Sequence, residues 1–387
     1  MKQYWLRFFK GVGGLEIMVA LFPIVAGYSN WGMIWSILMI IVALIRRNGS
    51  KMHFSDRYIS LCFLYVIIHE IIVLLINGLE TTMFHHLIAT SLYLLAVIIV
   101  PYSIKYENLI PSLYLIAIIA SIGLIFQFAE ILAGRMVTPI ALPFLPKPDL
   151  DSRLWAELGR PSSFFWEPAS FVTYMMIPLF ITLIKKHIPL SFFFFFCIIL
   201  STSSNGIFLA PVMIIVYILT SKAKKTNKFL ITVALAGMAM FFLQSDLFDI
   251  GKDKIENTEF SENVRIANGP TLVSRMPAID LIFGITETTV EKYLVKNPTG
   301  LSLSHMDSFF LSDFWYVMVV YGIIGLIFHL LVYFHLIKIE KSLMPYIAVL
   351  LIAHFTQSIS FRSMYVYQMI FIWAYVMYNK KNRNSHV

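Results

Sequence analysis

The residues of this chain best suited to proton transfer lie in two polar stretches that interrupt long apolar runs. His305 and Asp307 come shortly before one apolar run, and a neutral imidazole there can accept a proton from a hydroxyl group near neutral pH. Glu167 immediately precedes Pro168, which opens another apolar run at a position where helices tolerate proline. These three residues are candidate bases, although each could equally be a solvated or interfacial residue.

The same polar stretches contain arginines, whose guanidinium groups bind phosphate through paired hydrogen bonds and stay charged at any working pH. Any single arginine could also be a solvated residue, or one that extends its charge to the membrane surface. As a set they favour a site for a substrate that carries phosphate. Its members are Arg135, Arg153, Arg160, Arg265 and Arg275.

The sequence predicts neither a metal centre nor a nucleotide site. Its His, Cys, Asp and Glu residues show no metal-ligand spacing, and it has no glycine-rich phosphate loop. The two cysteines, Cys62 and Cys197, lie inside apolar stretches and imply no disulfide framework. We therefore expect no cofactor, and the sequence argues against a soluble machine driven by nucleotides.

Composition indicates that the elements around these residues are membrane-spanning helices. Of the 387 residues, 58% are hydrophobic and only 13% are charged, whereas soluble domains carry about a quarter charged residues. Apolar runs of about 15 to 20 residues alternate with charged or turn-forming segments. We predict an all-α polytopic membrane protein, a single membrane domain over 1–387. It would have about twelve transmembrane helices, at 12–28, 31–45, 58–76, 86–104, 109–129, 168–184, 188–202, 206–220, 229–243, 314–337, 343–359 and 364–378.

The basic residues predict the orientation of these helices. Most of the 30 Lys and Arg residues lie at the termini or in the short connections that follow even-numbered spans, and short basic loops face the cytoplasm. The N- and C-termini are then both cytoplasmic, and residues 1–10 lead into the first span rather than forming a cleaved signal peptide. Because these cations act as topology signals, the net charge of +8 does not indicate nucleic-acid binding.

Two connections are too long and too polar to be ordinary loops. Residues 130–167 and 244–313 both fall on the outer face, so we expect two large periplasmic or outer loops, the second with a short amphipathic helix over 271–285. Such an asymmetric arrangement favours a function at the outer face over solute transport, since transporters more often show matched halves. Ionisable residues inside the spans usually face the bundle interior. They are Glu16, His69, Glu70, His329, His335 and His354.

Four short motifs follow one another between residues 150 and 340. They are Arg160-Pro-Ser-Ser-Phe-Phe-Trp-Glu-Pro-Ala-Ser, then Ser201-Thr-Ser-Ser-Asn-Gly, then Arg265 ahead of Phe283-Gly-Ile, and last His305-Met-Asp-Ser-Phe ahead of Tyr321-Gly-Ile-Ile-Gly. Gly322 and Gly325 of the last motif are expected to allow close helix packing.

In their order, these motifs resemble those of bacterial polymerases of O-antigen and capsule repeat units, the Wzy type. The first is similar to R-x-x-G-F-F-x-E-P-S, the second to T-x-S-R-x-G, and the third to an arginine ahead of P-l-x-G-x-G. The fourth is similar to H-N-S-x-L…y-G-x-x-G, which O-antigen ligases share. The chain departs from the pattern in four respects: a serine (Ser162 or Ser163) replaces glycine, Asn205 replaces arginine, Met306 replaces asparagine, and the distance from His305 to Tyr321 is longer than in the ligases.

The resemblance implies a membrane glycosyltransferase that lengthens polysaccharide at the outer face of the bacterial plasma (inner) membrane. A growing glycan would move from undecaprenyl diphosphate to the terminal sugar of an incoming lipid-linked repeat unit. A base must take the acceptor proton, and His305, Asp307 or Glu167 could serve. Fixed positive charge must stabilise the departing diphosphate. We expect Arg265 first in that role, then Arg160 and Arg275, with Arg153 as a further candidate.

Two alternatives remain open from the sequence. One is an O-antigen ligase, which moves finished polymer to the lipopolysaccharide core (lipid A core), and the other is a transporter or flippase of lipid-linked sugars. For the polymerase, the implied partners are the undecaprenyl-diphosphate-linked glycan, membrane lipid, and a chain-length regulator and flippase of the same pathway. The sequence does not choose between O-antigen and capsule.

Overall fold

The computed structural model of the chain describes residues 11–28, 31–47, 56–78, 80–143, 145, 160–221, 237, 264–286, 289–290, 311–357 and 359–384. For 264–268 it describes the backbone alone. The expected span 229–243 lies outside these residues, apart from residue 237. Arg153, His305 and Asp307 of the predicted site lie outside them as well.

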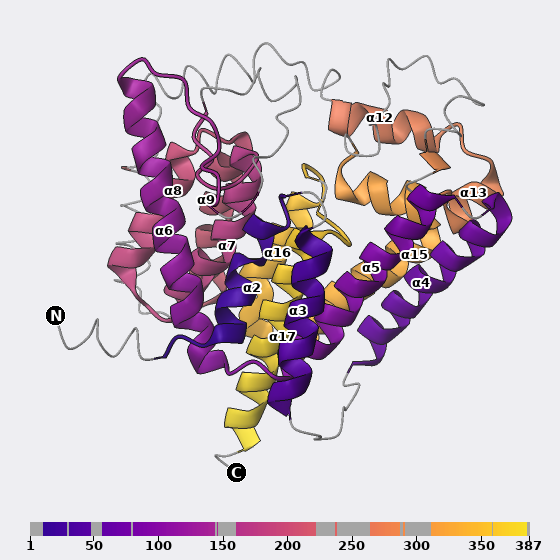
Figure 1. The fold of residues 1–387 in the computed structure, drawn as a ribbon, viewed down its shortest axis with the longest axis horizontal. Coiled ribbons are helices and arrows are strands. Elements are labelled where there is room, and N and C mark those ends of the chain that lie inside the picture. Colours follow the sequence, from indigo (N-terminus) through magenta and orange to yellow (C-terminus); the bar gives the residue numbers. More distant parts are fainter. Residues whose placement is uncertain are drawn as a thin grey trace.

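The described part of the chain is all α-helical, with thirteen α-helices and two short 3-10 turns (Figure 1). Four helical stretches are long and apolar enough to cross a membrane: Arg57–Ile76, Thr81–Tyr102, Tyr106–Leu132 and Asp313–Ile339. The helices are α2 (Gly14–Val25), α3 (Trp31–Arg47), α4 (Arg57–Asn77), α5 (Thr81–Ile99), α6 (Tyr106–Leu132), α7 (Pro168–Ile184), α8 (Ile188–Leu200), α9 (Ser204–Thr220), α12 (Val264–Val273), α13 (Ala278–Phe283), α15 (Asp313–Ile339), α16 (Met344–Ala353) and α17 (Ser363–Asn384).

Each expected span except 229–243 overlaps one of these helices, although 86–104, 343–359 and 364–378 differ from α5, α16 and α17 by five or six residues at one end or both. The all-α class and the apolar helices are therefore confirmed, while the total of twelve spans stays a prediction. The helix starts follow local rules. Asp56 caps α4 by accepting hydrogen bonds from the N–H groups of Tyr58 and Ile59. Pro168 is the first residue of α7, where its missing N–H has no helical partner to lose.

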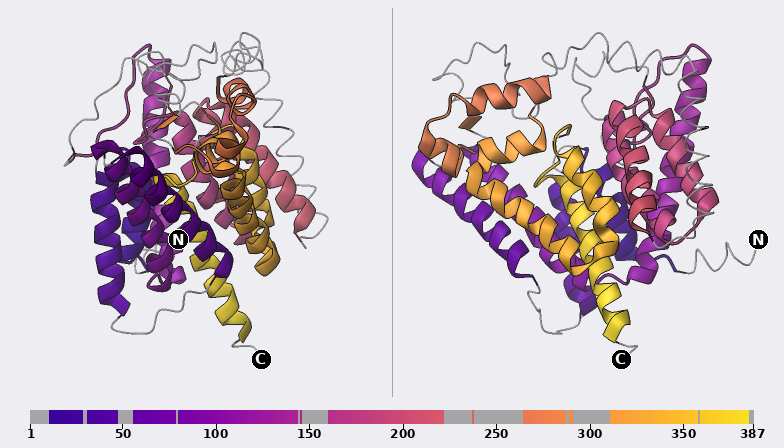
Figure 2. Two further views of the ribbon diagram at one scale, coloured as in Figure 1. Left: turned by 90° about the vertical axis from the view of Figure 1, so that its right-hand side faces the viewer. Right: turned by 180° about the vertical axis from the view of Figure 1, so that it is seen from behind.

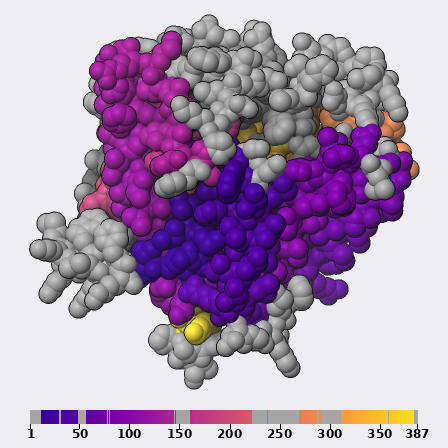
Figure 3. Space-filling model, viewed as in Figure 1, coloured from indigo at the N-terminus to yellow at the C-terminus, as the bar shows by residue number. Residues whose placement is uncertain are grey.

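The helices form two groups that share one continuous core. In Figure 1, α4, α5 and α15 run diagonally beside one another, and α12 and α13 lie across their upper ends. The remaining long helices stand more upright, and the rear view in Figure 2 shows α16 and α17 between the diagonal group and α7 to α9. On the face drawn in Figure 3, the surface of α2 and α3 continues into that of α4 and α5, which agrees with the packing of α3 against α5.

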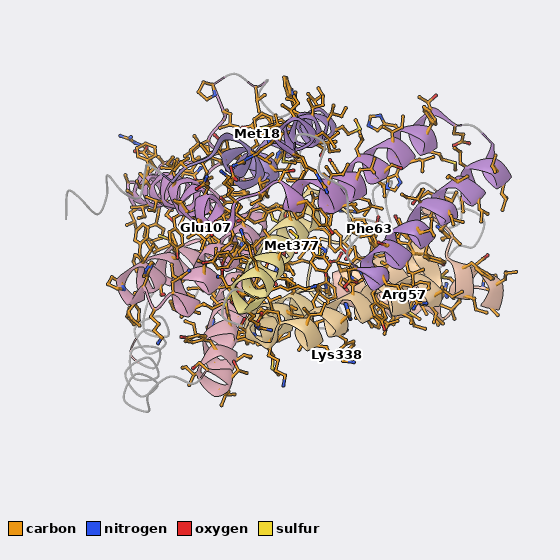
Figure 4. All side chains as sticks on the ribbon, turned by 90° about the horizontal axis from the view of Figure 1, so that it is seen from below. Met18, Arg57, Phe63, Glu107, Lys338 and Met377 are labelled. Carbon is orange, nitrogen blue, oxygen red and sulfur yellow. The ribbon has the colours of Figure 1, made fainter. Side chains whose placement is uncertain are left out.

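Ionic contacts gather several helix ends at the lower end of the molecule. Glu16 of α2 is fully buried and binds the Arg46 guanidinium of α3 through both carboxylate oxygens, at 2.8 and 2.9 Å, and the N–H of Lys105 at the start of α6. Glu340, after α15, binds Arg383 of α17 at 2.7 Å. Seen from below in Figure 4, Arg57 and Lys338 also lie at this end. Because successive predicted spans run in opposite directions, these helix ends should lie on the same side of the membrane. That this side is the cytoplasm stays a prediction.

The predicted amphipathic helix at 271–285 is two helices in the structure. α12 begins at Val264 and ends at Val273, and α13 covers Ala278–Phe283. Pro277 precedes α13 with an extended backbone (φ −55°, ψ 149°), which separates the two helices. Ile279, Ile282 and Phe283 of α13 are exposed, as expected of a helix that meets lipid at a membrane surface.

A break divides α15 into two arms. Gly322 has φ 70° and ψ −179°, so the helical hydrogen-bond ladder is interrupted in the first half of the helix. In Figure 1 the first arm lies nearly horizontally under α12, and the second descends diagonally beside α4. The expectation that Gly322 serves close helix packing is incomplete, because this residue also ends one arm and starts the next.

Candidate functional site

Only part of the predicted site lies among the residues that the structure describes. The side chains of Arg160, Glu167 and Arg275 are placed, whereas Arg265 is described only as a backbone position of α12. Arg275 follows the end of α12 and is exposed, with its N–H donating to the carbonyl of Leu272. The convergence of all seven predicted residues on one site therefore stays a prediction.

Gln127 of α6 fixes the segment that leads into α7. Its Oε1 accepts hydrogen bonds from the N–H groups of Ser162 and Ser163, at 2.9 and 2.6 Å. Its Nε2 donates to the carbonyl of Thr138 at 2.7 Å, and the N–H of Ile140 donates to the carbonyl of Ser163. One buried amide thus holds together the two ends of the connection between α6 and α7. Sequence reasoning missed Gln127, although a glutamine inside an apolar span is the kind of residue that marks a buried polar contact.

Arg160 joins the first motif to the second. Its Nη2 donates to the carbonyl of Thr202 at 3.0 Å, in the turn between α8 and α9. Thr202 has φ 53°, a left-handed conformation that closes this turn. The contact spans 42 residues of sequence. Arg160 therefore links the segment before α7 to the turn between α8 and α9.

Glu167 is the residue before α7 and has an extended backbone (φ −132°, ψ 147°). Its carbonyl accepts hydrogen bonds from the N–H groups of Ser170 and Phe171, which begins the helix. The neighbouring Trp166 packs so closely on Gly27 that a Cβ at that glycine would meet its indole ring at 2.5 Å. The first motif is therefore clamped against α2 as well as α6.

The third and fourth motifs meet at the break of α15. The N–H groups of Ile285 and Thr286 donate to the carbonyls of Val319 and Val320, at 3.0 and 3.1 Å. The break frees these carbonyls from the helix ladder, so the segment after α13 takes the place of the missing helical donors. Gly284 and Gly322 make this crossing possible, because a Cβ on either would lie within 2.3 Å of a carbonyl oxygen of the other segment.

Residues of α4 hold the same crossing from the other side. The Tyr65 hydroxyl donates to the carbonyl of Tyr321 at 2.8 Å, and the Tyr321 hydroxyl donates to Glu70 Oε1 at 3.0 Å. Glu70 is buried, its Oε2 lies 3.4 Å from Nδ1 of His86, and the neighbouring His69 ring packs against Tyr321 at 5.4 Å. The sequence marked His69 and Glu70 as ionisable residues inside a span, and the structure places both beside the fourth motif.

Hydrogen bonds link the start of α7 to the start of α15. The Thr173 hydroxyl of α7 donates a hydrogen bond to the side-chain carbonyl of Gln357. The backbone carbonyl of Gln357 accepts the N–H of Asp313 at 2.6 Å. Asp313 is the first residue of α15, and its carboxylate pairs with His354. Polar contacts therefore join α7, which follows the first motif, to α15, which carries the fourth.

These features define an α-helical protein with several long apolar helices, a multi-pass membrane protein in which buried polar side chains hold the described parts of the motifs. No protein-family model, no curated protein and no solved structure matches the chain. Metal-ligand clusters of three or more His, Cys, Asp or Glu side chains are not found in the described ranges.

Proposed function

We propose that this protein polymerises lipid-linked polysaccharide repeat units at the outer face of the bacterial plasma membrane. It would transfer a growing glycan from undecaprenyl diphosphate to the terminal sugar of an incoming lipid-linked repeat unit. The proposal rests on the resemblance of the four motifs and on how the structure pairs them.

The pairing of the motifs is the observation that carries this proposal. Arg160 of the first motif contacts Thr202 of the second, and Gly284 of the third crosses Gly322 of the fourth. The two segments of each pair are far apart in sequence. The first contact needs an arginine and the second needs glycines, and these are residue types that the motifs specify. Four segments that merely covered lipid-facing helix ends would have no reason to meet in this way.

The chemistry would need a base, a positively charged site and access from the membrane. His305, Asp307 or Glu167 would take the proton from the acceptor hydroxyl as the sugar–phosphate bond breaks. Arg265, with Arg160, Arg275 and Arg153, would stabilise the negative charge that develops on the departing lipid diphosphate. The lipid diphosphate is a good leaving group, so the sugar–phosphate bond already carries the driving force and the reaction needs no nucleotide.

The substitution Arg265→Ala tests the assignment most directly. In a strain that lacks the chromosomal gene, the variant should accumulate to the normal level in the membrane and produce no polymer ladder on a gel. Arg135→Ala is the matched control, because Arg135 also lies in an outer segment but binds Glu130 at 2.8 Å with an exposed side chain. Normal ladders from Arg265→Ala would contradict the arginine assignment.

The deletion strain itself separates the polymerase from the ligase. Loss of a polymerase leaves lipopolysaccharide capped with a single repeat unit, whereas loss of a ligase leaves uncapped core and polymer that stays on its lipid carrier. Lipopolysaccharide that is unchanged in both respects, together with unchanged capsule, would overturn the proposed function.

A further inference from the structure

A small, partly open cleft lies near one end of the bundle, where α4, the end of α5 and α17 come together. Two of the long apolar stretches terminate beside it, because Arg57–Ile76 begins there and Thr81–Tyr102 ends there. Each stretch is long enough to cross the hydrocarbon core of a bilayer, so their ends mark the level of the lipid head groups. Figure 4 views this end from below, with Arg57 of α4 and Met377 of α17 labelled, and Met377 is one of the residues that line the cleft.

The inner walls of the cleft are apolar. They are formed by Ile59 of α4, Val97 and Ile98 of α5, and Trp373 of α17. Val97 and Ile98 lie about one helical turn further into the bundle than Tyr102, which also lines the cleft. An apolar wall at this depth suits a hydrocarbon chain, and Trp and Tyr side chains are enriched at the level where such chains meet their head groups.

Positive charge lies at the outer edge of the cleft. The guanidinium of Arg47, the last residue of α3, lies 5.5 Å from the centre of the Tyr102 ring. Arg57 directly follows the lining residue Asp56, and its side chain is exposed. Guanidinium groups bind phosphate oxygens through paired hydrogen bonds, and clusters of arginine and lysine beside membrane spans attract negatively charged lipids.

The carboxylate of Asp56 is already engaged within the protein. Its Oδ1 accepts the N–H groups of Tyr58 and Ile59, at 2.9 and 3.3 Å, and its Oδ2 contacts Nε2 of His335. The His335 ring in turn packs on Tyr58, with the ring centroids 4.3 Å apart. Asp56 therefore holds the start of α4 in place, and the two arginines outnumber this one carboxylate at the cleft.

We propose that the cleft binds a phospholipid whose head group carries a net negative charge. One hydrocarbon chain lies along Val97, Ile98 and Trp373, and the phosphate lies at the outer edge, where Arg47 and Arg57 donate hydrogen bonds to its oxygens. The lipid touches both the diagonal group and α17, so it stabilises the contact between them. This inference does not depend on glycan transfer or on which side of the membrane the cleft faces, because it uses the ends of the spans alone.

Quenching of tryptophan fluorescence by brominated phospholipids tests the proposal, because bromine on a lipid chain quenches only the tryptophans close to it. The protein is placed in phosphatidylcholine bilayers that contain a small share of either brominated phosphatidylglycerol, which is anionic, or brominated phosphatidylcholine, which has no net charge. Comparison with Trp373→Phe isolates the signal of Trp373 among the seven tryptophans of the chain. At equal amounts the anionic lipid should quench Trp373 more strongly, and each arginine should contribute roughly fivefold to this preference. Arg47→Gln combined with Arg57→Gln should remove it.

Lys185→Gln combined with Lys186→Gln is the matched control, because it removes the same charge from exposed residues between α7 and α8 that do not line the cleft. That variant should keep the preference. The proposal is overturned if both brominated lipids quench the wild type equally, if Trp373→Phe is quenched to the same extent as the wild type, or if the arginine variant keeps the preference. The first comparison uses the wild type alone, so it decides even if a variant fails to fold.

Discussion

Gly284 and Gly322 are the residues on which the crossing of α13 and α15 depends. Their φ angles are +88° and +70°, and a Cβ on either would lie 2.2 to 2.3 Å from a carbonyl oxygen of the other segment. Gly284→Ala and Gly322→Ala should each destabilise the protein by more than the roughly 1–3 kcal/mol of backbone strain alone, because the segments must also separate. The midpoint of thermal unfolding in detergent measures this.

Substitutions at two further glycines distinguish the effect of backbone strain from the effect of the close approach between the two segments. Gly134 has φ +75°, but a Cβ at this position would have no other atom within 4 Å, so Gly134→Ala should show the strain without the separation. Gly14 has neither feature, and Gly14→Ala should leave the unfolding midpoint almost unchanged. Equal midpoints for Gly134→Ala and Gly322→Ala would show that the close approach contributes nothing.

Glu16 allows a sharp comparison of buried and exposed ion pairs. Its fully buried carboxylate depends on Arg46, so Arg46→Ala should destabilise the bundle by about 3–5 kcal/mol by leaving that charge unpaired. The pair of Glu130 and Arg135 has a guanidinium that is 69% exposed, and Arg135→Ala should cost less than about 1 kcal/mol. In a double-mutant cycle, adding Glu16→Gln to Arg46→Ala should restore part of the loss, and no recovery would contradict the charge argument.

The predictability of the site differs from residue to residue. Arg160 and Glu167 could be singled out because charged residues beside aromatic residues and Pro168 form a recognisable motif. Gln127 and Asp313 could not, since their importance comes from partners 35 and 47 residues away, Ser162 and Ser360, which no local pattern reveals. The buried pair of Asp313 and His354 was half visible: the sequence marked the histidine inside a span and passed over the aspartate at a helix start.

At the scale of elements, Gln127 fixes the segment between α6 and α7 to the helix bundle. Gln127→Leu would leave the N–H groups of Ser162 and Ser163 buried without acceptors, which typically costs about 1–3 kcal/mol for each unsatisfied group. The substitution should lower the unfolding midpoint and reduce polymer formation, because Arg160 would lose its fixed position.

Gln368 of α17 supplies the control for this prediction. It is equally buried, but its amide atoms make no hydrogen bond to the described groups. Gln368→Leu should therefore be nearly neutral or stabilising. A larger loss of stability for Gln368→Leu than for Gln127→Leu would contradict the role assigned to Gln127.

The helices were predictable to within a few residues where an apolar run has clear ends. The expected span 168–184 is α7 itself, because Pro168 and the lysines after Ile184 mark both ends. The break in α15 was not predictable, since 314–337 is apolar throughout and an interrupted helix differs from a continuous one only in the partners of its carbonyls. Those partners come from residues 285 and 286, in a separate part of the sequence.

For the whole molecule, the orientation in the membrane is the expectation that most needs measurement. Both native cysteines are buried, so they should not react with maleimides in the folded protein. A cysteine introduced as Met136→Cys, where the side chain is 82% exposed, should react in intact cells with an impermeant maleimide that reaches the outer face. Lys341→Cys, at the opposite end of the bundle, should react only after the membrane is opened. The reverse pattern would place the motifs in the cytosol and end the proposed function.

The contacts of α4 with the break in α15 also constrain how the chain is made. The Tyr321 hydroxyl that meets Glu70 is 251 residues further along the chain. At a synthesis rate of roughly 5–20 residues per second, α4 must wait on the order of ten to fifty seconds before this partner has been translated. During that interval His86, 16 residues after Glu70, can already contact its carboxylate. The contacts of α4 with Tyr321 can form only after α15 has been made, so α4 is expected to reach its final position in the bundle late.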